Sequence, residues 1–177
     1  MPRLDQIAIV AAGPSDAGDL ARVHVRAWRE TYRGQLPDAY LARMSPPLHA
    51  RRWRHQLTRA AAGDVVLAAE SAEGLVGYCG AHLLDGTDRG EVSTLYVLRS
   101  AQRRGLGRRL LGGAARVLAA SGACALDLWV LNGNTPADAF YAHMGGVAVG
   151  ERAVRGWGGG LRETLYRWSD IGDLTRV

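Results

Sequence analysis

The residues best suited to chemistry lie in a short glycine- and arginine-rich turn, Gln102-Arg103-Arg104-Gly105-Leu106-Gly107. The residues before it, Glu91–Leu98, are rich in β-branched and aromatic side chains, which predicts a strand. After it, apolar residues recur at helical spacing from Leu106 to Leu118, which predicts a helix. A helix start presents unpaired N–H groups and the positive end of the helix dipole, and glycines allow close approach. No Ser, Thr, Asp or Asn caps the turn, so we expect its amides to bind an anion such as phosphate.

Two common phosphate-binding motifs are excluded by the residues around this turn. A P-loop needs Gly-Lys-Ser or Gly-Lys-Thr, and the chain contains no lysine. A dinucleotide-binding fingerprint needs a third glycine three residues after Gly107, where Leu110 stands, and it usually lies in the first strand–helix unit. The familiar use of this pattern that remains is binding of the pyrophosphate of coenzyme A.

A second segment strengthens that interpretation. A predicted strand, Leu126–Leu131, precedes the spacing Asn-x-x-Ala-x-x-Phe-Tyr and a closing glycine, which are Asn134, Ala137, Phe140, Tyr141 and Gly145. In order and spacing, the two segments resemble the signature motifs of the GCN5-related N-acetyltransferases (GNATs), and the resemblance covers about residues 64–168. An aromatic residue usually follows the closing glycine in that family, whereas Gly146 stands here.

The resemblance implies an α/β fold, with a mixed central sheet of about seven strands and helices on both faces, and acetyl-CoA as co-substrate without a metal. It also implies how acetyl-CoA binds. The pantetheine lies along one strand, the pyrophosphate meets the amides of the turn, and an asparagine contacts the pantetheine arm. The strand residues along the pantetheine are Leu95, Tyr96 and Val97, and the asparagine is Asn134. The turn residues at the pyrophosphate are Arg103, Arg104, Gly105, Leu106, Gly107 and Arg108. A turn role for Asn134, within Asn-Gly-Asn, is compatible with this contact.

Acetyl transfer from a thioester needs a neutral amine, a donor for the oxyanion and a proton for the departing thiolate. The resemblance assigns the proton to Tyr141, on a helix that we expect Thr135 to cap, with Pro136 in its first turn. The alternative is that Tyr141 is a core aromatic residue paired with Phe140. The oxyanion donor is expected to be a backbone N–H of the strand near Val97.

Glu91 opens the first of these strands and is the candidate general base. Histone-acetylating members of the superfamily carry a catalytic glutamate near the start of this strand, at the same distance from Gly105-Leu106-Gly107. A carboxylate there takes the amine proton directly or through water. The alternative, a solvated residue at a strand edge, stays open. Another branch, the ribosomal-protein N-terminal acetylases, places its glutamate where Trp129 stands here, which argues against close kinship with that branch.

The sequence leaves the acceptor amine open. The resemblance implies that residues 27–37 line the acceptor side, so Trp28, Tyr32 and Arg33 are predicted to shape the pocket; core packing is the alternative for Trp28. A small amine, an antibiotic amine, an amino acid and a protein N-terminus all stay open. Two other functions compete with an N-acetyltransferase that works by direct attack in a ternary complex. These are a catalytically silent acyl-CoA-binding module and an arginine-rich nucleic-acid-binding protein.

The hydrophobic pattern predicts the elements that position these residues: a strand, three helices, three strands, a helix, a strand, a helix and two strands. The expected strands are 6–10, 65–70, 75–84, 91–98, 126–131, 147–154 and 161–168, and the expected helices begin near 16, 37, 48, 107 and 135, the third ending at 62. This predicts a single domain, residues 1–177, with acceptor-side helices at about 15–62 and an acetyl-CoA-binding core at about 64–168.

Composition limits the setting. No stretch reaches the ~20 apolar residues of a membrane span, and the N-terminus lacks the pattern of a signal peptide, so we expect a cytoplasmic protein without a membrane partner. All 22 basic residues are arginine, but no nucleic-acid motif accompanies them, so no nucleic-acid partner is expected. Cys79 and Cys124 are predicted to be buried free thiols, and no spacing fits a metal site. A homodimer is expected because many GNATs form one.

Overall fold

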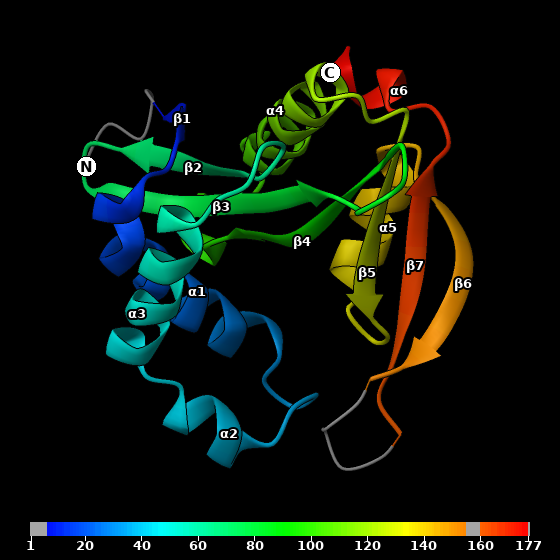
Figure 1. Ribbon diagram of the computed structural model, residues 1–177. Coiled ribbons are helices and arrows are strands. Elements are labelled where there is room, and N and C mark those ends of the chain that lie inside the picture. Colours follow the sequence, from blue (N-terminus) through cyan, green and yellow to red (C-terminus); the bar gives the residue numbers. More distant parts are fainter. Residues whose placement is uncertain (1–6, 155–159, 177) are drawn as a thin grey trace.

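A seven-stranded mixed sheet runs through the residues that the computed structural model describes, 7–154 and 160–176 (Figure 1). The strands lie in the order β1-β2-β3-β4-β5-β7-β6. β4 and β5 are parallel, and the other neighbouring strands are antiparallel. The strand bounds are β1 Ala8–Ala11, β2 Val65–Ser71, β3 Gly74–Leu83, β4 Arg89–Val97, β5 Ala125–Leu131, β6 Val147–Ala153 and β7 Arg162–Trp168.

Helices cover both faces of the sheet. α4 packs on β2, β3 and β4 from one side, while α1 packs on β3 and β4 from the other and carries α3 on its outer surface. Each helix turns an apolar stripe to the sheet: Leu110 and Leu118 of α4 and Leu20 of α1 are fully buried, at about 1.5–3 kcal/mol each. The helix bounds are α1 Ala17–Thr31, α2 Asp38–Arg43, α3 Pro46–Thr58, α4 Leu106–Ala120, α5 Thr135–His143 and α6 Gly172–Thr175.

The predicted order of elements and the α/β class are confirmed. Both predicted bounds of α3 were wrong, because the helix begins at Pro46 rather than 48 and ends at Thr58 rather than 62. Pro46 and Pro47 fit the first turn because the N–H groups of a first turn have no partner within the helix. The sequence pattern also missed α6 and two short 3₁₀ turns, Pro14–Asp16 and Arg99–Ala101, which are too short to show a periodicity.

The parallel strands β4 and β5 pair over only part of their length. Their register runs from Arg89 opposite Ala125 to Val92 opposite Leu128, and no pairing follows beyond that point. The rest of β4, Ser93–Val97, therefore has an unpaired edge on the side of β5. In Figure 1 the group of β5, β7 and β6 diverges from β1–β4 at this place.

A bulge in β4 changes which side chains share a face of the sheet. Val92 lies opposite Ala81 and Thr94 lies opposite Gly80, so Ser93 is an extra residue. Without the bulge, Glu91 and Tyr96 would point to opposite faces, because they are an odd number of residues apart. With it, both reach the face covered by α1, while Val92, Leu95 and Val97 pack toward α4.

The two cysteines differ. Cys79 lies fully buried in β3, and burial raises the pKa of its thiol to about 12. Cys124 is a free thiol just before β5 and is exposed, so its predicted burial was wrong. Its apolar neighbours in the sequence mark the start of β5, but the residue itself lies in the bend that leads into the strand.

Candidate active site

The turn before α4 carries a run of backbone amides with no partner among the described residues. Arg103 and Gly105 have φ angles of 62° and 72°, and Gly105 stands at the N-cap of α4. Left-handed residues this close together turn successive N–H groups toward one concave site, which suits an anion. The amide of Arg109 is the first to donate along α4, to the oxygen of Gly105 at 3.0 Å, which leaves the amides of residues 103–108 available.

The two glycines of this turn are required for different reasons. A Cβ at Gly105 would meet no atom within 4 Å, but its positive φ disfavours any other residue. A Cβ at Gly107 would lie 3.2 Å from the ring of Phe140, so the absence of a side chain at Gly107 allows α4 and α5 to pack closely against each other. The side chain of Gln102 donates to the oxygen of Val97 at 3.0 Å and ties the turn to the end of β4. The turn thus has fixed geometry before any ligand binds.

α5 begins at the turn after β5, one residue away from the predicted cap. Asn134, not Thr135, stands at its N-cap, and the oxygen of Asn134 accepts hydrogen bonds from the amides of Ala137 and Asp138. Neither residue caps the helix through its side chain. Thr135 was predicted from its hydroxyl alone, but the turn at Gly133, which has a φ of 93°, sets the start of the helix.

Tyr141 lies in the core, which is one of the two alternatives that the sequence left open. Its ring packs in the core against Phe140, Tyr166 and Trp168, at centroid distances of 5.1, 5.9 and 6.2 Å. The residue is only 7% exposed, and burial raises the pKa of its hydroxyl, with smaller contributions from Cys79 and Tyr32. The phenol is therefore protonated at neutral pH, which is the form that donates a proton. Within the described residues its hydroxyl forms no hydrogen bond.

A cavity of about 260 Å³ lies on the face of the sheet opposite α4. It brings together four residues that the sequence singled out, Trp28, Tyr32, Glu91 and Tyr96. Arg33 lies outside it and lines a wider groove along the exposed side of α1. The lining also contains residues that were not predicted: Leu36, Val92, Ser93, Trp129, Leu131, Arg152, Val154, Leu161 and Glu163.

Tyr96 points into this cavity. Its hydroxyl lies 3.0 Å from that of Tyr32, and burial raises the pKa of both phenols. The side chain of Tyr96 thus lines this cavity, although its backbone was predicted to contact the cofactor. Both roles are compatible because the backbone edge of β4 beyond Val92 is unpaired toward β5.

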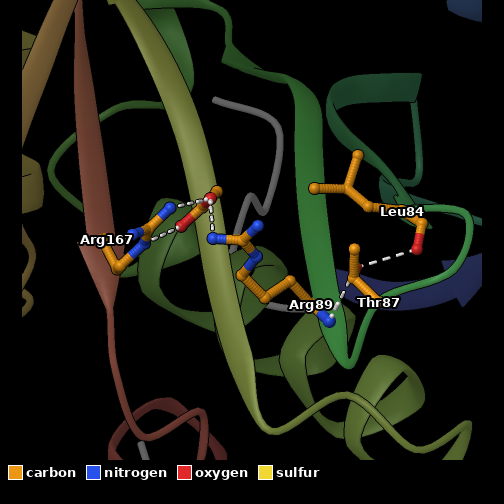
Figure 2. A network of polar contacts seen from close by, with 5 residues as sticks. Leu84, Thr87, Arg89 and Arg167 are labelled. Carbon is orange, nitrogen blue, oxygen red and sulfur yellow. Dashed lines mark hydrogen bonds and ion pairs between the residues drawn. The ribbon is translucent and has the colours of Figure 1, made fainter.

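Glu91 stands next to a buried charge cluster at the base of the divergence. It lies opposite Asp127 in the β4–β5 register. Asp127 accepts two hydrogen bonds from Arg167 of β7, at 2.7 and 2.6 Å, and lies 4.0 Å from Arg89 of β4. Figure 2 shows Arg89 and Arg167 approaching this carboxylate from two strands, and Thr87 holding the turn that leads to Arg89. The cluster joins three strands where β4 and β5 separate.

A buried histidine lies behind the tyrosines of the cavity. His24 of α1 lies 2.6 Å, through Nδ1, from the hydroxyl of Tyr78, and its ring stacks on Trp28. Burial lowers the pKa of His24 to about 4, and His49 and Arg52 contribute in the same direction. His24 is therefore neutral at neutral pH, which avoids a buried positive charge.

Sequence reasoning missed the far wall of the cavity, above all Trp129, Arg152 and Glu163. The guanidinium of Arg152 in β6 lies 3.8 Å from the ring centroid of Trp129 in β5 and pairs through Nε with Glu163 of β7. These residues are far apart along the chain and form no motif. The alternation of β5 was the available signal, since Trp129 and Leu131 must face away from the buried Leu128 and Val130.

Residues 7–154 and 160–176 contain no group of three or more His, Cys, Asp or Glu side chains placed to hold a metal ion. The same residues contain no helix that is long and apolar enough to cross a membrane.

Comparison with known proteins agrees with this geometry. The sequence model of the Acetyltransferase (GNAT) family matches residues 25–146. Among curated proteins, the chain is 29% identical over 172 residues to the uncharacterized N-acetyltransferase YuaI of Bacillus subtilis, covering 95% of this chain and 96% of YuaI.

Solved structures of this family share the fold. The PaiA N-acetyltransferase of Thermoplasma acidophilum, solved with coenzyme A, superimposes with a TM-score of 0.77 at 18% identity, covering 92% of this chain and 98% of PaiA. YncA of Salmonella typhimurium, a putative acetyltransferase solved with acetyl-CoA, gives a TM-score of 0.70 at 17% identity, with 94% of each chain covered. With the family match over residues 25–146, the chain belongs to the GNAT family of acetyltransferases and is an acetyl-transferring enzyme.

Proposed function

We propose that the protein transfers the acetyl group of acetyl-CoA to a primary amine of a small molecule or peptide, by direct attack in a ternary complex. The observation that carries the proposal is the divergence of β4 and β5. On one side of it lie the free amides of residues 103–108 and the buried phenol of Tyr141. On the other side lies the cavity that contains Glu91.

The cofactor half of the proposal rests on backbone groups. The amides of residues 103–108 bind the pyrophosphate, and Arg103, Arg104 and Arg108 supply positive charge around it. The pantetheine adds to the open edge of β4 in the manner of a further strand. Asn134, at the start of α5, contacts the pantetheine arm from the side of β5.

The orientation of β4 supports a backbone oxyanion donor. The amide of Leu98 donates to the oxygen of Val76 in β3, at 2.8 Å. Because successive N–H groups of a strand point to opposite edges, the amide of Val97 faces the open edge. A thioester oxygen beside Val97 meets a fixed donor there, which stabilises the negative charge that develops on that oxygen.

Two side chains then move the protons. The neutral amine attacks the thioester carbon, the C–S bond breaks, and the thiolate takes the proton of the Tyr141 hydroxyl. Glu91 accepts the proton that the amine loses, directly or through a water molecule. This proton transfer is needed because a free amine is mostly charged at neutral pH. The Tyr32–Tyr96 pair positions the amine between these groups.

The test is calorimetry with acetyl-CoA, followed by measurement of free CoA released in the presence of a panel of amines. We expect acetyl-CoA to bind with a micromolar Kd and at least one amine to release CoA. Glu91→Gln should then lower kcat by about 100-fold without changing the affinity for acetyl-CoA.

Two results would count against the proposal. Folded protein without affinity for CoA or acetyl-CoA removes the cofactor site. Tight binding without transfer to any amine supports the other candidate, a catalytically silent acyl-CoA-binding module.

A further inference from the structure

Two arginine–glutamate pairs cross the β6–β7 ribbon, and they face opposite sides. Arg162 pairs with Glu151 at 2.9 Å and lies outside the cavity. Arg152 pairs with Glu163 and lines the cavity, with its guanidinium over Trp129. The first pair is half exposed on both sides, whereas in the second pair Arg152 is 55% exposed and Glu163 only 18%. The ribbon thus places one of two similar pairs in the acceptor pocket.

Arg152 is held in place by two contacts and keeps free donors. Its flat face rests on Trp129, and its Nε bonds to Glu163. Within the described residues its terminal nitrogens form no hydrogen bond. A guanidinium fixed in this way presents its terminal N–H groups as a preformed fork for a carboxylate.

The other wall of the cavity carries the complementary charge. Glu91 has no ion pair or hydrogen bond within the described residues. It lies opposite Asp127, two residues before Trp129 in the parallel β4–β5 register, and both Glu91 and Trp129 line the cavity. An unpaired carboxylate and an arginine with free donors therefore lie on either side of a small space.

We propose that the acceptor is a small molecule with a carboxylate beside its amino group, of the α-amino acid class. Arg152 binds the carboxylate through its terminal nitrogens, Glu91 binds the ammonium and then accepts its proton, and Trp28, Tyr32 and Tyr96 surround the side chain. The inference rests on the proposed function and specifies its acceptor. A cavity of about 260 Å³ suits a molecule of this size.

The charges disfavour an acceptor that lacks the carboxylate. Such an amine would still bind Glu91, but it would cover the terminal nitrogens of Arg152 without giving them a partner. Donors that lose water without gaining a hydrogen bond reduce affinity. The carboxylate is therefore expected to act mainly on KM, while kcat depends on Glu91 and Tyr141.

The experiment compares each amino acid with its own amide, for example leucine with leucinamide, using release of CoA from the purified, full-length protein. We expect kcat/KM to favour the amino acids by about 10-fold or more, mostly through KM. Arg152→Gln should reduce this preference to below about 3-fold, mainly by lowering kcat/KM for the amino acids. Arg152→Lys keeps the charge but not the forked pair of donors, so its preference for amino acids should lie between those of the unaltered protein and Arg152→Gln.

Arg162→Gln is the matched control, because it breaks the equivalent pair outside the cavity and should keep the preference. Equal use of amides and amino acids by the unaltered protein overturns this inference and leaves the proposed function intact. A preference that survives in Arg152→Gln also overturns it. Transfer to no acceptor at all overturns both, and chemical denaturation of each variant shows whether the fold is kept.

Discussion

The two sides of the sheet at the β4–β5 divergence are built in different ways. The cofactor side consists of the turn of residues 102–108 and Tyr141, and it offers mainly backbone amides and one phenol. The acceptor side consists of the cavity and the groups behind it, and it offers side chains from α1, β4, β5, β6 and β7. In the proposed function, fixed backbone binds a cofactor that never changes, and side chains that can vary without altering the fold select the acceptor.

The two sides also differ in what holds them together. The turn of residues 102–108 depends on positive φ angles and one side-chain bond, from Gln102 to Val97. The acceptor side depends on buried polar groups, such as Asp127 with Arg167 and His24 with Tyr78. Substitutions on the cofactor side are therefore expected to change binding or turnover, and those behind the acceptor side to change stability as well.

The largest expected effect is on stability, at the base of the acceptor side. Asp127→Asn removes the charge that Arg167 and Arg89 share, while the residue stays 96% buried with those cations beside it. We expect the free energy of unfolding to fall by about 2–3 kcal/mol in urea denaturation at neutral pH, the range for hydrogen bonds to a charged group. Glu151→Gln, at an exposed ion pair of the same region, should change it little, and equal losses would contradict the difference between the two sites.

The next effect is on turnover, at the cofactor side. Tyr141→Phe keeps the packing of the ring but removes the proton donor, so kcat should fall by about 100-fold while the Kd for acetyl-CoA stays the same. Tyr166→Phe is the control, since that hydroxyl bonds to Asp138 and its ring lies beside Tyr141. An unchanged kcat in Tyr141→Phe would remove this residue from the chemistry.

A pH effect should come from His24 on the acceptor side. Its pKa is about 4 in the folded protein and 6.5 in the unfolded chain, so the unfolded chain binds more protons between these values. Stability is therefore full above about pH 6.5 and is lost as the pH falls toward 4, by about 2 kcal/mol at pH 5. His49 and Arg52 of α3 face His24, and the pKa of His49 is also lowered.

Denaturation at about pH 7.5 and pH 5 measures this loss. In His24→Gln the difference between the two pH values should shrink, even though the variant is less stable at both because its bond to Tyr78 is altered. An unchanged pH dependence would show that other groups cause it.

The smallest effect is expected at the turn. Gly105→Ala forces a Cβ into a left-handed conformation, which costs about 1–2 kcal/mol, although no atom lies within 4 Å of that Cβ. The turn is expected to relax to relieve this strain, which moves its amides and raises the Kd for acetyl-CoA by about 10-fold. Gly150→Ala, at an open position with an ordinary φ, should leave the Kd unchanged. A normal Kd in Gly105→Ala would mean that the turn is not the anion site.

Local patterns allowed most elements and the cofactor motif to be predicted. The apolar spacing of α4 predicts a helix, and the β-branched run of β4 predicts a strand. The absence of Gly-Lys-Ser, which excludes a P-loop, is likewise evident from adjacent residues alone. Predictions that depended on neighbours in space were less accurate. Thr135 is not the cap, and Cys124 is exposed. Arg33 lines another groove, and its contact with the acceptor stays a prediction.

By itself, the sequence determined the order of the elements, the family and the backbone turn before α4, because periodicity and glycine positions act within a few residues. Only the tertiary structure decided the lining of the cavity that we propose for the acceptor. The bulge at Ser93 brings Glu91 and Tyr96 to one face, and the antiparallel register of β6 and β7 brings Arg152 to Glu163. Contacts of this kind join residues far apart along the chain, so the spacing of residues in the sequence carries no trace of them.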